Sequence, residues 1–198
     1  MTGVFWRCPI TDFKIKKQIY HSLVESHLNY GLLLYASSFS RQVANHTDES
    51  HSYYTPSNLK PVNVTLNKIL RAIFRVPKYD KKTKTYTDNS ILYKKLGVLK
   101  LIDLYRYNLA ILVYNAIYSE TCPRAIAELF KLRSDVIQRN TRAHEMDLYF
   151  ETPHCTKALC KPSIAGALLW NSLPSELKIC TSLLKFKTAL KVSLTRNY

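Results

Sequence analysis

The stretch SIAGALLWNSLPSELKICTSLLKF (residues 163–186) is the most apolar part of the chain, and the expected fold is built around it. Its first half has the apolar spacing of a helix that carries Trp170 at its edge. Pro174 ends that helix, because proline has no N–H and disfavours a helical residue before it. A second amphipathic helix follows, and its expected inward residues are Leu183, Phe186, Leu190 and Leu194. The sequence therefore predicts two helices that meet in a corner at a large indole.

Upstream of this corner, apolar residues recur at helical spacing in several segments. These segments span residues 19–34, 66–74, 91–96, 102–118 and 123–130. The segment 102–118 is apolar around most of its circumference, so we expect it to be buried at the centre of the core. Thr11 or Asp12 is expected to cap the first helix, and Thr87 or Asp88 the helix at 91–96. Gly97 is well placed to end the latter.

Two regions lack a clear helical pattern. Residues 37–62 contain two prolines, many polar residues and no apolar period, which predicts a long polar loop. Residues 146–150 have the pattern of a short strand. We therefore expect a mainly α fold with a small β-hairpin near 140–162. The chain divides into a tail (1–13), a helical region (14–131) and a C-terminal helical tail region (132–198).

The charge of the chain is strongly one-sided. It has 198 residues, with 29 Lys and Arg against 14 Asp and Glu, which gives a formal net charge of +15. A balance this basic favours a polyanionic partner, with nucleic acid first and an anionic membrane surface second. The plainer alternative is a basic but otherwise ordinary soluble domain, because net charge does not determine the fold.

The densest basic run begins on the helix at 66–74 and continues beyond it. Its cationic residues are Lys68, Arg71, Arg75, Lys78, Lys81, Lys82 and Lys84. Asp80 is the only acid among them, and Tyr79 and Tyr86 interleave with the cations. Cations at several points bind backbone phosphates, and aromatic rings stack on exposed bases. We favour a nucleic-acid-binding surface over the alternative of a solvated basic face, because the whole chain is basic.

Motifs of catalysis and metal binding are missing from the sequence. It has no phosphate-binding glycine loop, no nucleophile elbow and no H-E-x-x-H. Its aspartates are scattered and form no local motif for a two-metal site. The five cysteines are irregularly spaced, and the pair Cys155 and Cys160 beside His154 is a weak zinc signal. We expect no enzyme activity of the chain alone, no cofactor and no bound metal.

The start of the chain, MTGVFWRCPITDFKIKK (1–17), lacks the long apolar run and the small-residue cleavage site of a secretory signal. The longest apolar runs are also too short and too interrupted to span a bilayer. We therefore expect an intracellular protein, cytoplasmic or nuclear, without a membrane partner.

Five stretches occur in order between about residue 14 and the end of the chain. They are IYHSLVESHLNYG (19–31), LNKILRAIFR (66–75), the segment 91–114, NTR (140–142) and the pattern SI…G…LWNSLP…FK (163–187). Each is weak alone. Together they resemble the C-terminal region, thumb and post-thumb, of reverse transcriptases from jockey-like non-LTR retrotransposons.

This resemblance implies a helical, thumb-like bundle that grips a template–primer duplex. Lys68, Arg71 and Arg75 fall on positions of the family's basic helix and are implied to contact the duplex. The sequence also departs from the family. The fingers and the palm, with their paired catalytic aspartates, would lie before residue 14. The polar insert at 37–62 is longer than usual, and Tyr35-Ala36 stands where Trp-Gly is common.

The predicted function is a non-catalytic nucleic-acid-binding remnant of such a reverse transcriptase, which binds the backbone of an RNA or DNA duplex. Two alternatives stay open: a helical protein-interaction or structural module, and a decayed retroelement fragment without function. For the corner, we expect Trp170 and Leu173 to pack the C-terminal helix onto the buried helix 102–118.

Overall fold

A computed structural model describes residues 12–44, 55–81, 84–136, 146–155 and 157–196. Most of these residues are helical, and their only strands form one small antiparallel pair. This confirms the expectation of a mainly α fold with a small hairpin. No helix in the described part of the chain is long and apolar enough to cross a membrane.

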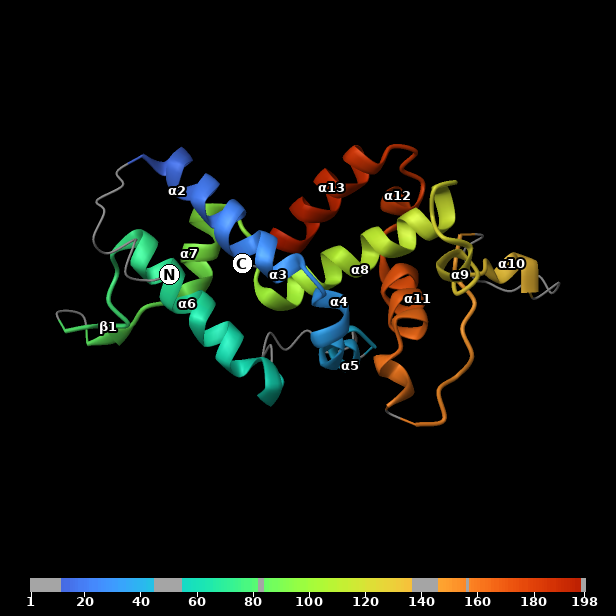
Figure 1. Cartoon of the computed structure of the whole chain (residues 1–198), viewed down its shortest axis with the longest axis horizontal. Coiled ribbons are helices and arrows are strands. Elements are labelled where there is room, and N and C mark those ends of the chain that lie inside the picture. Colours follow the sequence, from blue (N-terminus) through green and yellow to red (C-terminus); the bar gives the residue numbers. More distant parts are fainter. Residues whose placement is uncertain (1–11, 45–54, 82–83, 137–145, 156, 197–198) are drawn as a thin grey trace.

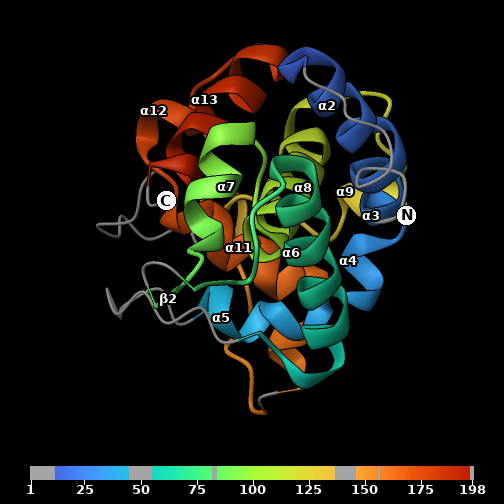
Figure 2. The same cartoon turned by 90° about the vertical axis from the view of Figure 1, so that its left-hand side faces the viewer.

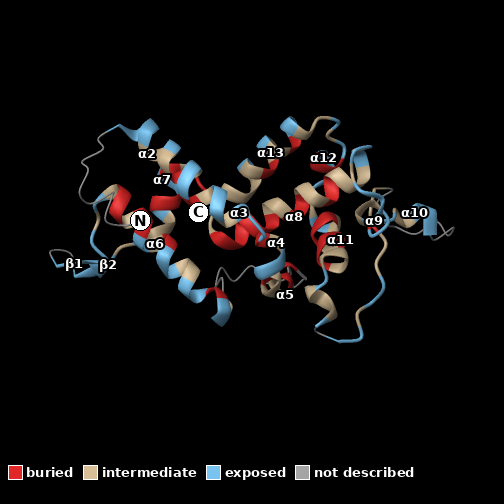
Figure 3. Ribbon diagram, viewed as in Figure 1, coloured by how far each residue is buried: buried red, intermediate tan, exposed pale blue. Residues whose placement is uncertain are grey.

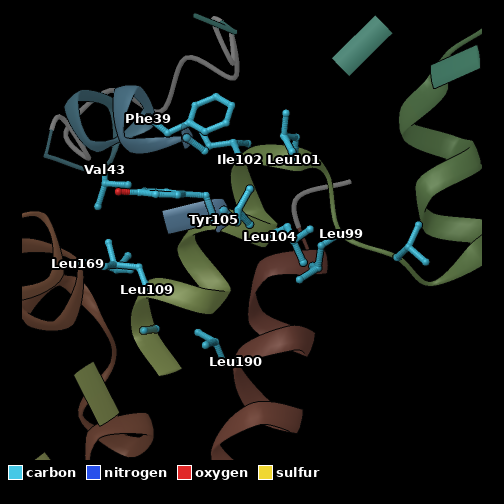
Figure 4. Close-up of a cluster of buried hydrophobic side chains, with 14 of the residues drawn as sticks. Phe39, Val43, Leu99, Leu101, Ile102, Leu104, Tyr105, Leu109, Leu169 and Leu190 are labelled. Atoms are coloured by element: carbon cyan, nitrogen blue, oxygen red, sulfur yellow. The ribbon is translucent and has the colours of Figure 1, made fainter. Parts of the chain in front are cut away.

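Helix α8 (Leu101–Tyr118) is the centre of the molecule, as its apolar circumference predicts. Helices α4 (Leu32–Tyr35), α11 (Pro162–Ser172) and α13 (Leu183–Thr195) pack against it (Figure 1). In the close-up of the core, Leu109 of α8 lies in one cluster with Leu169 of α11 and Leu190 of α13 (Figure 4). The buried core cluster contains residues from both the expected helical region (14–131) and the C-terminal region (132–198).

The N-terminal helical run begins before the apolar pattern at 19–34 and is broken once within it. It begins as α2 (Phe13–Tyr20), where the Asp12 carboxylate caps the first turn by accepting the N–H of Lys14 at 2.8 Å. A π-helical turn (His21–Glu25) and α3 (Ser26–Asn29) follow. Gly31 then adopts a φ of 68°, in the left-handed region, and breaks the helix before α4. The helical spacing at 19–34 is therefore confirmed on both sides of a break at residues 30 and 31.

The expected loop at 37–62 contains more regular structure than its polarity suggests. A 3₁₀ turn (Ser37–Phe39) leads into α5 (Ser40–Ala44), and a second 3₁₀ turn (Ser57–Leu59) leads into α6 (Lys60–Phe74). Phe39 and Val43 are buried one helical turn apart. Burial of these two side chains in the core favours helical structure despite the polar residues around them. The loop prediction is therefore wrong for the described residues 37–44 and 57–62. Residues 45–54 lie outside the described residues.

Helices α6 and α7 (Asn89–Leu96) pack together at one end of the molecule (Figure 2). Both predicted terminal signals of α7 are confirmed. Asp88 accepts the N–H of Ser90 at 2.8 Å, and Gly97 ends the helix with a φ of 67°. Between α6 and α7 lies the hairpin, formed by β1 (Tyr79–Asp80) and β2 (Thr85–Tyr86).

The C-terminal corner closes on α8 as expected. Trp170 is fully buried, with its ring centroid 6.0 Å from Phe186 of α13 and 6.4 Å from Tyr118 of α8. Leu173 is partly buried against the same core. After it come α12 (Ser175–Lys178) and α13. Phe186 and Leu190 are the buried residues of α13, as its apolar spacing predicts.

A short extended segment, 146–150, runs beside the corner. Leu148 forms an isolated antiparallel bridge with Leu132, just before α10 (Arg133–Val136). The side chain of Asn171 serves as its second partner, because it accepts the N–H of Leu148 at 2.8 Å and donates to the oxygen of Leu148 at 3.0 Å. The two-stranded hairpin of the described residues thus lies at 79–86. Within the expected range 140–162, the described residues contain the bridge of Leu148 to Leu132, and residues 137–145 and 156 are not described.

Two short helical segments connect the longer helices described above. They are α9 (Arg124–Ala127), which follows Pro123, and the 3₁₀ turn at Ala158–Cys160 before α11. Gly166 lies in α11 where that helix packs tightly against Phe130 and Val113. A Cβ at this position would stand 2.8 Å from Phe130 and 2.9 Å from Val113 of α8, so only glycine fits without a shift of either side chain.

Candidate nucleic-acid interface

One side of α6 is exposed and carries cations. Leu66, Ile69, Leu70 and Ile73 are buried on its other side. This pattern turns Lys68 to solvent and leaves Arg71 half-buried at the edge. The outer side of α6 and the hairpin that follows it are exposed (Figure 3). Packing of the apolar stripe therefore presents the cationic stripe at the end of the molecule.

Arg75 ends α6 in an unusual backbone conformation. Its φ of 55° and ψ of 39° are left-handed, at a position where glycine is common. The Arg75 N–H donates to the oxygen of Ala72 at 3.2 Å, and the Val76 N–H donates to the oxygen of Arg71 at 3.0 Å. These two bonds close a Schellman motif, although a residue with a Cβ loses roughly 1–2 kcal/mol in this conformation. The side chain of Arg75 is exposed.

Arg71 differs from the other predicted contact residues, because a neighbouring helix already holds it. Its Nη1 donates to Oδ1 of Asn89, the first residue of α7, at 3.0 Å. Its charge also acts on the pKa of Tyr93, a buried residue of α7. Burial raises the pKa of the Tyr93 hydroxyl, and the charge of Arg71 offsets part of that rise. Arg71 therefore ties α6 to α7 and contributes its charge from the edge of the exposed side.

The hairpin arranges the second half of the basic run. Tyr79 pairs with Tyr86 and Asp80 with Thr85, while the N–H of Thr87 donates to the oxygen of Lys78 at 3.0 Å. Three of its lysines, Lys78, Lys81 and Lys84, are exposed. Lys84 has a φ of 55° at the end of the turn. Lys82 lies outside the described residues.

The hairpin register also places two tyrosines side by side. The ring centroids of Tyr79 and Tyr86 are 5.1 Å apart, with 63° between the ring planes. Tyr79 is 42% exposed and Tyr86 is 72% exposed, so both rings reach solvent. We call them the tyrosine pair. An exposed aromatic ring beside cations is the type of surface on which an unpaired base stacks.

The exposed cations form a surface with little opposing charge. We use the name basic surface for Lys68, Arg75, Lys78, Lys81 and Lys84. The acids of this part of the chain are Asp80, which is half-buried, and Asp88, which caps α7. Such an arrangement of cations can neutralise several phosphates along a nucleic-acid backbone.

Metal binding has no support within the described residues. They contain no group of three or more His, Cys, Asp or Glu side chains that could hold a metal ion. Cys122, Cys155, Cys160 and Cys180 are free thiols. Cys8 lies outside the described residues.

Several features of this surface were not predicted from the sequence. The sequence shows the interleaved tyrosines but does not predict their pairing across a hairpin, although two tyrosines flanking a lysine-rich turn are compatible with short strands. The bond from Arg71 to Asn89 and the left-handed backbone of Arg75 have no local sequence signal.

Comparisons with known proteins identify no relative: no protein-family model, no curated protein and no solved structure matches the chain.

Proposed function

We propose that this chain is a non-catalytic nucleic-acid-binding protein that holds the sugar–phosphate backbone of a duplex. The observation that supports this proposal is the basic surface, together with the tyrosine pair beside it. Five exposed cations from one helix end and one hairpin provide separate contacts for successive phosphates. Binding through phosphates is weakly dependent on sequence and strongly dependent on salt.

The resemblance of the sequence to the thumb region of non-LTR reverse transcriptases points in the same direction. Within that resemblance, Lys68 and Arg75 occupy the exposed side of the basic helix, while Arg71 is held by α7. We assign the direct phosphate contacts to Lys68 and Arg75 and a positioning role to Arg71. Catalysis of polymerisation is not proposed, because no paired catalytic aspartates are found in the sequence.

The proposal is tested by the salt dependence of binding to a primer–template duplex, offered both as DNA and as an RNA–DNA hybrid. Fluorescence anisotropy gives the affinity between about 50 and 200 mM salt, a range over which phosphate contacts weaken steeply. The variant Lys68→Ala, Arg75→Ala, Lys81→Ala should lower the slope of log affinity against log salt by roughly 2–3, about one for each lost phosphate contact.

A matched variant separates a defined surface from general attraction by net charge. Lys131→Ala, Lys157→Ala, Lys185→Ala also removes three exposed positive charges, but from other elements. It should keep nearly the wild-type slope. An equal loss of slope in both triple variants would show that binding follows net charge alone, and the basic surface would lose its assignment.

A further inference from the structure

A groove lies on a different part of the molecule from the basic surface. It has a volume of about 490 Å³ and runs between the end of α7, the middle of α8 and the outer side of α13. Lys94 lies on the α7 side, Tyr107 comes from α8, and α13 lines the other side. The groove is open, so a segment of another molecule can enter it.

Helix α13 presents a second apolar stripe toward this groove. Phe186 and Leu190 fill the inward side of the helix. Leu184 and Val192 line the groove instead and are 75% and 52% exposed. They are eight residues apart, which corresponds to about 12 Å along a helix. Thr188 lies between them and also lines the groove, so the stripe offers two apolar contacts with a small residue in the middle.

The charge of the groove has one sign. Lys94, Lys187 and Lys191 line it, and none of the described residues that line it is acidic. A fourth cation is close by, because Nζ of Lys17 is 3.5 Å from the place where a Cβ of Gly97 would stand. Glu25 does not line the groove, although its charge adds to the effect of burial in raising the pKa of Tyr107, and its carboxylate contacts His21.

We propose that this groove binds an acidic amphipathic helix of a protein partner. Such a helix would place its apolar stripe on Leu184 and Val192 and its carboxylates beside the lysines on both sides. A second copy of this chain is a poor occupant, since its net charge of +15 repels the groove. A nucleic-acid strand is a poorer match than a protein helix, because its phosphates would use the lysines and leave the exposed apolar side chains of Leu184 and Val192 without a partner.

The test uses a designed peptide as the probe. It is an 18-residue, fluorescein-labelled helix with leucines at spacings of three and four and glutamates on both flanks. A scrambled peptide of the same composition lacks the stripe. Fluorescence anisotropy should show binding of the designed peptide at least about tenfold tighter than the scrambled one, which corresponds to about 1.4 kcal/mol. Equal affinities would mean that only charge is recognised and would overturn the proposal.

The groove is then located by variants of exposed residues. Leu184→Gln with Val192→Thr should weaken the designed peptide at least about tenfold, since truncating a central apolar contact commonly has this effect. Leu34→Gln with Ile91→Thr is the matched control, because these residues are 79% and 52% exposed but do not line the groove. It should bind like wild type. The same loss in the control pair would place the peptide elsewhere.

A final arm separates this site from the duplex-binding surface. The variant Leu184→Gln, Val192→Thr should bind the primer–template duplex like wild type, and Lys68→Ala, Arg75→Ala, Lys81→Ala should bind the peptide like wild type. If the groove variant loses duplex binding instead, and an unlabelled oligonucleotide displaces the peptide, the groove belongs to a nucleic acid and the proposal fails. Duplex binding can fail on its own without affecting this result.

Discussion

The C-terminal corner and the α6–hairpin end of the molecule use the same kinds of side chain in opposite ways. In the corner, Lys178 is 3% exposed, and its Nζ donates to Asp147 at 2.9 Å and to the backbone oxygen of Asn171 at 3.0 Å. At the α6–hairpin end, Lys68 and Lys84 are exposed. Lys178 in the corner is a structural residue with fixed partners, while Lys68 and Lys84 on the basic surface present their charges to solvent.

The aromatic residues show the same contrast. Tyr114 of α8 stacks on Phe186 with centroids 4.6 Å apart and ring planes 24° apart, inside the core. The tyrosine pair forms an edge contact at the surface. The most motif-like stretch of the sequence, LWNSLP (169–174), therefore serves packing, while the candidate interface is marked only by charge and exposed rings.

The largest expected effect tests whether the corner is purely structural. Trp170→Ala removes a fully buried indole and the bond from its Nε1 to the oxygen of Met146 at 2.9 Å. We expect a loss of roughly 3–5 kcal/mol in the free energy of unfolding, measured by chemical denaturation. At a temperature where the destabilised variant is still folded, it should bind the duplex like wild type. If it unfolds at the wild-type denaturant concentration, the corner is not core and a partner surface becomes the better account.

The next effect concerns the bond between Asn171 and the segment 146–150. Asn171→Ala leaves the N–H and the oxygen of Leu148 without this partner, so we expect a loss of about 2 kcal/mol in the free energy of unfolding, roughly 1 for each bond. Asn171→Asp keeps an acceptor for the N–H of Leu148 but places a part-buried carboxylate oxygen against the oxygen of Leu148, so it should not restore the lost stability. Native-state hydrogen exchange at Leu148 locates the effect. Unchanged exchange in the alanine variant would show that Asn171 does not hold this segment.

The sequence predicts best those features that depend on neighbours in the chain. Asp12, Asp88 and Gly97 act at helix ends as expected, because a cap is a contact within one turn. The burial of helix α8 follows from apolar residues that lie around most of its circumference. Features that depend on distant partners were missed. Phe39 is buried within a polar segment because α8 lies opposite: its ring is 6.0 Å from that of Tyr105.

In the candidate site too, the sequence predicts local properties and not contacts with distant residues. The cations are readable from the sequence, because charge is a property of each residue. Their roles are not, because the role of Arg71 depends on Asn89, eighteen positions away. The hairpin was expected near 140–162, since 146–150 resembles a strand, but its partners there are Leu132 and an asparagine side chain. A pattern of period two predicts an extended backbone without specifying what pairs with it.

A third prediction separates stability from binding at one residue. Arg75→Gly removes an exposed cation and also relieves the left-handed backbone, so we expect a gain of about 1 kcal/mol in the free energy of unfolding. The salt slope for duplex binding should fall by about one. Arg75→Lys is the control, because it keeps the charge and the strain and should preserve the slope. A stabilised glycine variant with an unchanged slope would remove Arg75 from the basic surface.

The smallest expected effect on stability belongs to the tyrosine pair and sharpens the contrast with the buried aromatic rings. Tyr86 is 72% exposed, so Tyr86→Ala should change the free energy of unfolding by only about 0.2–1 kcal/mol, the range of a cross-strand pair. Its effect should appear in binding, because a stacked base contributes roughly 1–3 kcal/mol. Affinity for a primer–template with a single-stranded overhang should fall at least about fivefold, while affinity for a blunt duplex of the same length stays near wild type. Tyr86→Phe keeps the ring and should bind both like wild type. An equal loss for blunt and overhanging duplexes would mean that the ring supports the hairpin lysines and does not stack on a base.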